Sequence, residues 1–124
     1  MGLTIKEVSE KYGIPADTLR YYEKVGVIPP VTRTSGGIRD YCESDISWVK
    51  NAKCMRAAGL SIEALIEYVA LFRQGEDTAE ARKNLLVEQR RSLCERIEEM
   101  QRTLDRLDQK ISGYHNFLAD KKLK

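Results

Sequence analysis

One cysteine of the chain lies among positively charged residues. Cys54 follows Lys50 by four residues, a spacing that places both side chains on one face of a helix, and Lys53 and Arg56 are close in sequence. Cations near a thiol enrich the nucleophilic thiolate. The sequence therefore predicts that Cys54 adds to a small electrophile such as an aldehyde, giving a hemithioacetal. The alternative is a free cysteine that only fills space in a small domain.

The other two cysteines are weaker candidates for thiol chemistry. Cys42 lies just before a predicted helix, whose first backbone N–H groups also favour a thiolate, and it is the second choice as sensor. Cys94 lies beside the apolar seam described below and is expected to pack. Three widely spaced cysteines fit neither a disulfide framework nor an iron–sulfur cluster, so we expect no metal and no cofactor.

A second group of candidate residues lies near the N-terminus. The predicted helix that follows Pro15 turns Ala16, Asp17, Arg20 and Tyr21 outward. Arg20 can reach phosphates or a guanine edge, and Tyr21 can donate to a phosphate. Two short helices with a glycine turn and a basic outer face predict a helix-turn-helix that binds DNA. The alternative is an ordinary helical hairpin with a solvated face.

Capping residues place the helices of this head. Thr4 and Glu7 form a capping box, which predicts a helix that ends before Gly13. Pro15 is expected to begin the second helix, which runs to about residue 24. Two further helices are expected over residues 43–58 and 62–73. Between the second and third helices, residues 31–41 predict two extended runs around a glycine turn, a wing that carries Arg33 and Arg39.

After Thr78 the chain follows a single pattern. Apolar residues recur at alternating spacings of three and four residues, which is a heptad seam, and Arg90 interrupts it. A helix over residues 79–118 would be about 60 Å long. The small head cannot cover such a helix, so we expect a homodimer. The predicted seam consists of Leu86, Leu93, Ile97, Met100, Leu104, Leu107, Ile111, Tyr114 and Leu118.

Composition narrows the function classes further. The chain has 124 residues and a net charge of +2, and the basic excess lies in residues 1–56. It contains neither an apolar run long enough for a membrane span nor a secretory signal core, so we expect a cytoplasmic protein that does not contact a membrane. With no acid–base pair, nucleotide loop or metal motif, an enzyme is not expected.

Five motifs of the chain are Thr4–Val8, Thr18–Glu23, Gly26–Pro29, Gly37–Tyr41 and Ala58–Glu63. Together they resemble the signature of the MerR family of dimeric bacterial transcription regulators. One departure is Ile38, where many members have tyrosine. The resemblance implies a winged helix-turn-helix that contacts DNA and a long antiparallel dimerisation helix. The implied DNA contacts are Thr4, Ala16, Asp17, Thr18, Arg20, Tyr21, Arg33, Gly37, Arg39 and Tyr41.

The same resemblance implies a mechanism and a signal. MerR dimers bind a pseudo-palindromic promoter spacer and distort it, which affects RNA polymerase through the promoter. The run Lys53–Arg56, with Gly37–Tyr41, is similar to the branch that responds to aldehydes and related electrophiles through one cysteine. No cysteine follows Cys94, unlike in metal-sensing relatives.

These observations predict a mainly α protein. A winged helix-turn-helix DNA-binding head is expected in residues 1–75, and a long C-terminal antiparallel coiled-coil dimerisation helix with a short tail in residues 76–124. Two other functions stay open. One is an effector-independent repressor or DNA-architectural protein of the same fold, and the other is a coiled-coil interaction adaptor that does not bind DNA.

Overall fold

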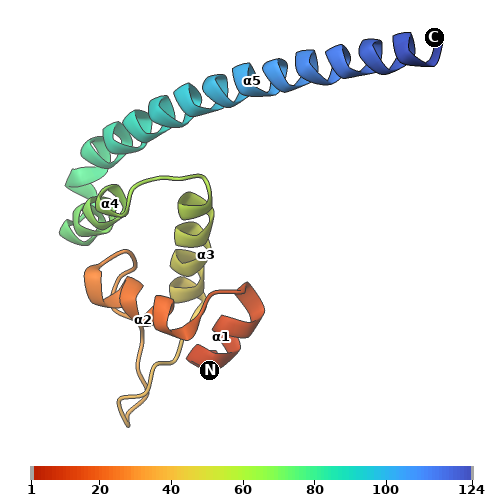
Figure 1. Ribbon diagram of the computed structural model, residues 1–124. Coiled ribbons are helices and arrows are strands. Elements are labelled where there is room, and N and C mark those ends of the chain that lie inside the picture. Colours follow the sequence, from red (N-terminus) through yellow and green to blue (C-terminus); the bar gives the residue numbers. More distant parts are fainter. Residues whose placement is uncertain (1, 124) are drawn as a thin grey trace. The chain divides into compact units, whose positions relative to one another are not determined.

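The computed structural model describes residues 2–123, and most of them are helical (Figure 1). The predicted mainly α fold class is confirmed. The elements in chain order are α1 (Ile5–Tyr12), α2 (Ala16–Val25), α3 (Glu43–Ala57), α4 (Ile62–Gln74), the 3-10 turn η1 (Glu76–Thr78) and α5 (Ala79–Leu123).

The contacts divide the chain into two units, one that ends at Gln89 and one that begins at Arg90. The first unit holds α1 to α4 and the first turns of α5, and the second holds the rest of α5. The functional boundary between residues 75 and 76 stays a prediction.

Local capping explains where the first helices begin and end. The Thr4 hydroxyl accepts a hydrogen bond from the Glu7 backbone N–H, and the Glu7 carboxylate accepts one from the Thr4 N–H, so the predicted capping box is present. Gly13 then adopts a left-handed conformation with φ of 66° and ends α1. Pro15 is the N-cap of α2 rather than its first residue.

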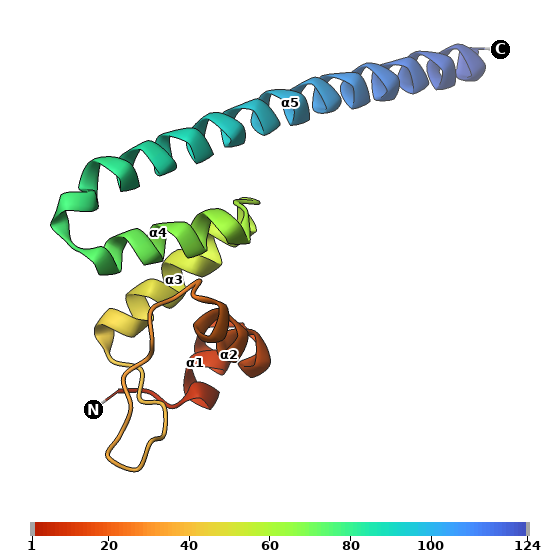
Figure 2. The same cartoon turned by 90° about the vertical axis from the view of Figure 1, so that its left-hand side faces the viewer.

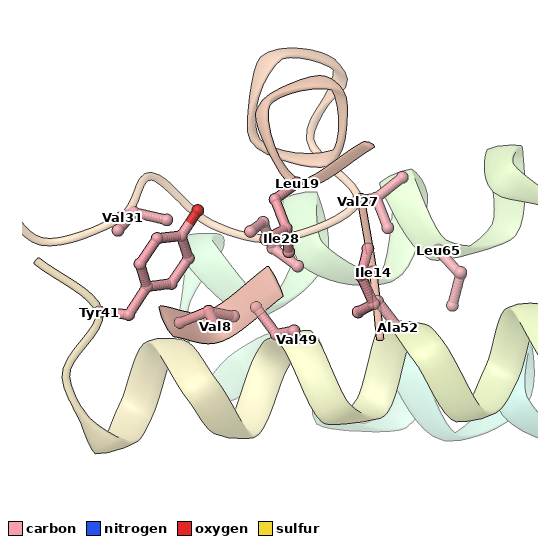
Figure 3. Packing of buried hydrophobic residues seen from close by; sticks show 10 residues of the cluster. All are labelled: Val8, Ile14, Leu19, Val27, Ile28, Val31, Tyr41, Val49, Ala52 and Leu65. Carbon is pink, nitrogen blue, oxygen red and sulfur yellow. The ribbon is translucent and has the colours of Figure 1, made fainter. Parts of the chain in front are cut away.

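The core of the first unit lies between α3, α2 and the segments that join the helices (Figure 3). Val8, Leu19 and Val49 are completely buried there, one each from α1, α2 and α3. The buried apolar side chains of α3 are Val49 and Ala52, whereas Trp48 is only half-buried. The remaining buried members of the cluster are Ile14, Val27, Ile28, Val31, Tyr41 and Leu65.

The segment expected to form a β-hairpin is a wing held by few backbone contacts. Arg33 and Arg39 form an isolated antiparallel bridge, with Thr34 N to Ile38 O at 2.8 Å and Asp40 N to Thr32 O at 2.7 Å. The paired stretch is too short to be a regular strand. Its base is tied to the N-terminus by a second bridge, Leu3 to Tyr41. Within the first unit, this loop projects on the side away from α4 (Figure 2).

The helix α5 confirms the long C-terminal helix and extends past the predicted end at residue 118. Along the chain as described, most seam side chains are exposed, including Met100 at 70% and Leu104 at 50%. Among residues 2–123, no helix has a stretch both long and apolar enough to cross a lipid bilayer.

Candidate nucleic-acid interface

The outer face of α2 presents a cation and a phenol. The Arg20 guanidinium forms an ion pair with the Asp17 carboxylate at 2.8 Å, and both side chains are exposed. Tyr21 is 45% exposed, and its ring lies 6.5 Å from the ring of Tyr22, which packs on the core. Because Leu19 is fully buried on the opposite side, Arg20 and Tyr21 must face outward. An exposed pair of this kind can donate to phosphate oxygens or a base edge.

The carboxylate of Glu23 ties α2 to the wing. Its Oε2 accepts a hydrogen bond from the Val31 backbone N–H at 2.8 Å, and its Oε1 accepts one from Arg39 Nε at 2.7 Å. The Arg33 guanidinium lies 3.6 Å from the same oxygen. Both wing arginines therefore converge on one carboxylate, and Arg33 remains the more exposed of the two.

The electrostatics of Glu23 favour its charged form. Its partial burial alone would raise the pKa, but the hydrogen bonds from Arg39 and Val31, together with the positive charges of Arg39 and Arg33, outweigh burial and leave the pKa lowered. Glu23 therefore stays ionised and holds the wing beside α2. Sequence reasoning missed this role, although Glu23 ends the motif Thr18–Glu23 that it singled out.

The tip of the wing is a turn that needs glycine. Gly37 has φ of 83°, and its N–H donates to the Thr34 carbonyl at 2.9 Å. Arg33 also donates to the Gly37 carbonyl at 3.1 Å. Ile38, where many family members have tyrosine, is 68% exposed and offers an apolar side chain there.

Three of the residues predicted to contact DNA are more buried than a DNA contact requires. Tyr41 is completely buried, and its hydroxyl has no hydrogen-bond partner among residues 2–123. Burial raises the pKa of this phenol. Its ring fills the core between the wing and α3, so we leave Tyr41 out of the DNA surface. Ala16 and Thr18 are half-buried on α2, whereas Thr4 is exposed, with its hydroxyl serving as the cap of α1.

A second carboxylate that sequence reasoning missed fixes the other end of the wing. Asp45 is only 8% exposed, and its Oδ2 accepts hydrogen bonds from the backbone N–H groups of Cys42 at 3.0 Å and Thr32 at 3.2 Å. Burial opposes ionisation, but these hydrogen bonds outweigh it and lower the pKa of Asp45. The signal in the sequence was an acid three residues after the residue that precedes the helix, as in a capping box.

The candidate sensor Cys54 is exposed on α3, as its position on the helix predicted. Lys50 is also exposed, one turn earlier on the same face. The other two predicted cations are engaged elsewhere: Lys53 donates to the Tyr12 carbonyl, and Arg56 donates to the Leu60 carbonyl. The Lys53 ammonium caps the end of α1, and the Arg56 guanidinium binds the segment between α3 and α4, so Lys50 is the predicted neighbour that remains for Cys54.

The other two cysteines are partly buried. The Cys42 sulfur lies 3.5 Å from the Thr32 hydroxyl at the start of α3, and Cys94 lies on α5. Among the described residues, no three histidine, cysteine or acidic side chains gather as a metal site would require.

A helical head whose helix α2 presents an exposed arginine and tyrosine, a wing held to α2, and a long C-terminal helix are features of a DNA-binding regulator. A family model described as MerR HTH family regulatory protein matches residues 3–71, and one described as MerR, DNA binding matches residues 46–110. The chain therefore belongs to the MerR family of transcriptional regulators, and its homologues are regulators rather than enzymes.

Individual relatives agree with this family. The HTH-type transcriptional regulator AdhR of Bacillus subtilis (strain 168) is 58% identical over 93 residues, which are 75% of this chain and 66% of that protein. The crystal structure of a MerR family regulator from Listeria monocytogenes has a TM-score of 0.93 and 54% identity, covering 99% of this chain and 95% of that one.

A third relative was solved with nucleic acid. The structure of HiNmlR, described as a MerR family regulator lacking the sensor domain and bound to promoter DNA, has a TM-score of 0.84 and 33% identity. The match covers 94% of this chain and 92% of that one.

Proposed function

We propose that this chain is a homodimeric regulator that binds promoter DNA with two heads. In this proposal α2 enters the major groove, where Arg20 and Tyr21 contact phosphates or base edges, and the wing contacts the flanking backbone with Arg33. The observation that carries the proposal is the exposure of Arg20 and Tyr21 on α2, beside a wing that Glu23 holds in place.

The proposed mechanism is distortion of the promoter spacer. Two heads linked by paired α5 helices would bind a pseudo-palindrome. Bending or untwisting this DNA costs about 1–6 kcal/mol, and the protein–DNA contacts offset that cost. RNA polymerase is then affected through the geometry of the promoter. The free energy of the protein–DNA contacts must offset the cost of distorting the spacer. An effector that changes either of these two free energies changes transcription.

The DNA surface is tested by Arg20→Ala. We expect this variant to weaken binding to the DNA upstream of its own gene by about 1–3 kcal/mol, because one charge-assisted contact is lost. Affinity of the unaltered protein should fall steeply with added salt, since counterions are released on binding. Binding is measured by fluorescence anisotropy at several salt concentrations.

The matched control for this test is Arg91→Ala. Arg91 is another exposed arginine, and it forms an ion pair with Glu95 on α5 at 2.6 Å. Removing it changes the net charge equally but leaves α2 intact, so affinity should stay within a factor of two. Equal affinities of all three proteins would remove Arg20 from the interface, and salt-independent binding would favour an interaction adaptor.

We propose further that Cys54 is the sensor of aldehydes or related electrophiles. Its exposed thiol and the Lys50 side chain on the same face support this assignment. The thiolate sulfur forms a bond to the carbonyl carbon, the C=O π electrons move to oxygen, and a proton from water completes a hemithioacetal. No leaving group is released, so the signal is reversible.

Cys54→Ser tests the sensor without disturbing the fold. Because Cys54 is exposed, the variant should dimerise and bind DNA normally but lose the transcriptional response to formaldehyde or methylglyoxal. In the unaltered protein these aldehydes should slow alkylation of Cys54 by iodoacetamide, read by peptide mass spectrometry. Cys94→Ser is the control and should respond normally.

One observation favours a second candidate function, regulation without an effector. Lys53 and Arg56 donate to backbone carbonyls, which leaves Cys54 with fewer nearby cations than its sequence predicted. If Cys54→Ser and the unaltered protein repress or activate equally, with and without aldehyde, the chain acts as an effector-independent repressor or architectural protein.

A further inference from the structure

An aromatic cleft lies between α3 and α4 in the first unit. Its walls are Trp48 from α3 and Tyr68 and Phe72 from α4, and its volume is about 230 Å³. The ring centroid of Trp48 lies 4.9 Å from that of Phe72, edge to face, and 6.1 Å from that of Tyr68. Trp48 and Tyr68 are half-buried and Phe72 is 46% exposed, so part of each ring stays accessible along the single chain.

The polar edge of this cleft lies on the face of α3 that carries Cys54. Ser47 and Asn51 complete the lining of the cleft. Cys54 follows Ser47 by seven residues and Asn51 by three, so the three side chains share one face of the helix. The rise from Asn51 to Cys54 is about 4.5 Å along the helix axis, a distance that one small molecule spans.

We propose that this cleft binds the ring of an aromatic aldehyde and thereby directs its reactive end to Cys54. The inference rests on the proposed function, in which Cys54 is the sensor, and it adds the class of electrophile. Three aromatic side chains give the edge and face contacts that a flat ring prefers. At the polar edge, Ser47 and Asn51 can donate hydrogen bonds to the aldehyde oxygen, which makes the molecule more electrophilic.

The size of the cleft limits the ligand to one ring. Pockets for drug-sized ligands hold about 300–1,000 Å³, whereas this cleft holds about 230 Å³. A single ring with a short side chain therefore fits, and a fused polycyclic molecule does not. A small aldehyde without a ring reaches Cys54 too, but it gains nothing from the aromatic walls.

The cleft favours a neutral ring over an organic cation. Among the residues that the structure describes, none that lines the cleft carries a charge. The Arg82 guanidinium already lies 5.3 Å from the centroid of the Phe72 ring, and its Nε donates to the Thr78 hydroxyl at 3.0 Å. One cation–π position is therefore taken, and the charge of Arg82 repels a second cation without affecting a neutral ring.

The test compares two unsaturated aldehydes that differ in the ring. Cinnamaldehyde carries a phenyl group where crotonaldehyde carries a methyl group. With either one, the Cys54 thiolate sulfur forms a bond to the β-carbon, and the C=C π electrons move toward the carbonyl to give an enolate. A proton from water then binds the α-carbon, and the product is a stable thioether with no leaving group.

The rate of thioether formation is measured in a protein whose single thiol is Cys54. Cys42→Ser and Cys94→Ser leave this thiol alone, because the sequence has three cysteines. Peptide mass spectrometry gives the rate for each aldehyde. Dividing each rate by that of glutathione with the same aldehyde removes the difference in intrinsic reactivity.

We expect the normalised rate for cinnamaldehyde to exceed that for crotonaldehyde about tenfold or more, because a ring held in the cleft makes the addition effectively intramolecular. Phe72→Leu removes one aromatic wall and should reduce this ratio to less than threefold without changing the crotonaldehyde rate. Phe117→Leu is the matched control, since it removes an exposed ring from α5, and it should keep the ratio.

A ratio near one before any wall is changed overturns the cleft as a ligand site. If Cys54 still reacts with both aldehydes in that case, the proposed sensor stands, whereas a Cys54 that reacts with neither overturns the sensor as well. A ratio that Phe72→Leu leaves unchanged also overturns the cleft, because the preference then arises elsewhere.

Binding without reaction gives a second measurement that does not depend on the thiol. Trp48 is the only tryptophan of the sequence, so its fluorescence reports on the cleft. In Cys54→Ser, benzyl alcohol should change this fluorescence to saturation and protect Trp48 from quenching by acrylamide, whereas 1-butanol, which has no ring, should not. A Trp48 that acrylamide cannot reach before ligand is added shows a closed cleft and overturns the proposal.

Discussion

Glu23 receives hydrogen bonds from two segments that must stay together if the head is to bind a duplex. Its carboxylate joins α2 to Val31 and Arg39, so the recognition helix and the wing are held in one arrangement before DNA arrives. Preorganisation of this kind lowers the ordering cost of binding. The arginines that Glu23 holds can exchange this carboxylate for a phosphate.

Replacing Glu23 with glutamine should weaken the hydrogen bonds that hold the wing to α2. The amide has the same shape, but it is neutral, so charge-assisted hydrogen bonds are lost, at a cost of about 1–3 kcal/mol in the free energy of unfolding. Urea unfolding at pH 7 measures this change. Glu7→Gln is a control on an exposed carboxylate, and it should have a smaller effect.

The pH dependence of stability follows from the same carboxylate. The pKa of Glu23 is lowered by folding from its ordinary value of 4.5, so its contribution is fully present above pH 4.5 and is lost as the pH falls through the folded pKa. Folding also lowers the pKa of Asp45 from its ordinary value of 3.8, so its contribution to stability is likewise lost at low pH. Stability of the unaltered protein should therefore fall more steeply below pH 4.5 than that of Glu23→Gln. Parallel acid curves for the two proteins would contradict this assignment.

At the scale of elements, helix positions could be read from the sequence because their signals are local. Thr4, Gly13 and Ser61 cap helices through contacts within a few residues, and the observed helix ends lie within a few residues of the expected ones, α5 differing most. The wing could not be read in the same way. Its fixing contacts, from Glu23 to Arg39 and from Asp45 to Thr32, join residues far apart in sequence.

The candidate site shows the same limit. Periodicity placed Arg20 and Cys54 outward correctly. It did not show that Tyr41 is a core residue, because the wing is too short to give a pattern of alternating faces. Nor did it show that Lys53 would cap the end of α1, since its acceptor, the Tyr12 carbonyl, is 41 residues away in sequence and is brought close only by folding.

The wing turn is an element whose shape depends on one backbone conformation. At Gly37, φ of 83° is unfavourable for any residue with a Cβ, although in the part of the chain that the structure describes no atom lies within 4 Å of the position a Cβ would take. Gly37→Ala should therefore cost about 1–2 kcal/mol of stability through backbone strain alone. Gly36→Ala is the matched control, because Gly36 does not have positive φ. A Cβ at Gly36 would lie 3.8 Å from its nearest neighbour, the Thr34 hydroxyl oxygen, which is an ordinary contact. Thermal unfolding and DNA affinity measure both variants, and equal losses would show that the turn does not depend on the Gly37 conformation.

At the scale of the whole molecule, the proposed mechanism depends on a pair of chains. One head contacts a single half-site, and only a linked second head makes both contacts one binding event with a high effective concentration. The exposed seam of α5 is the surface that can supply this link. A change that breaks the pair should therefore weaken DNA binding without altering the head.

Leu104→Lys tests this dependence. Leu104 is 50% exposed along the single helix and lies within the predicted seam, so a lysine there brings one charge from each chain into the seam. We expect monomers by sedimentation at micromolar concentration and at least a tenfold loss of affinity for a two-half-site DNA. Gln109→Lys adds the same charge on the outward side of α5 and should stay dimeric. A half-site DNA should bind Leu104→Lys and the unaltered protein almost equally, because each head is intact. A dimeric Leu104→Lys would show that the seam is not the link, and a monomer with full affinity would show that DNA binding does not need the pair.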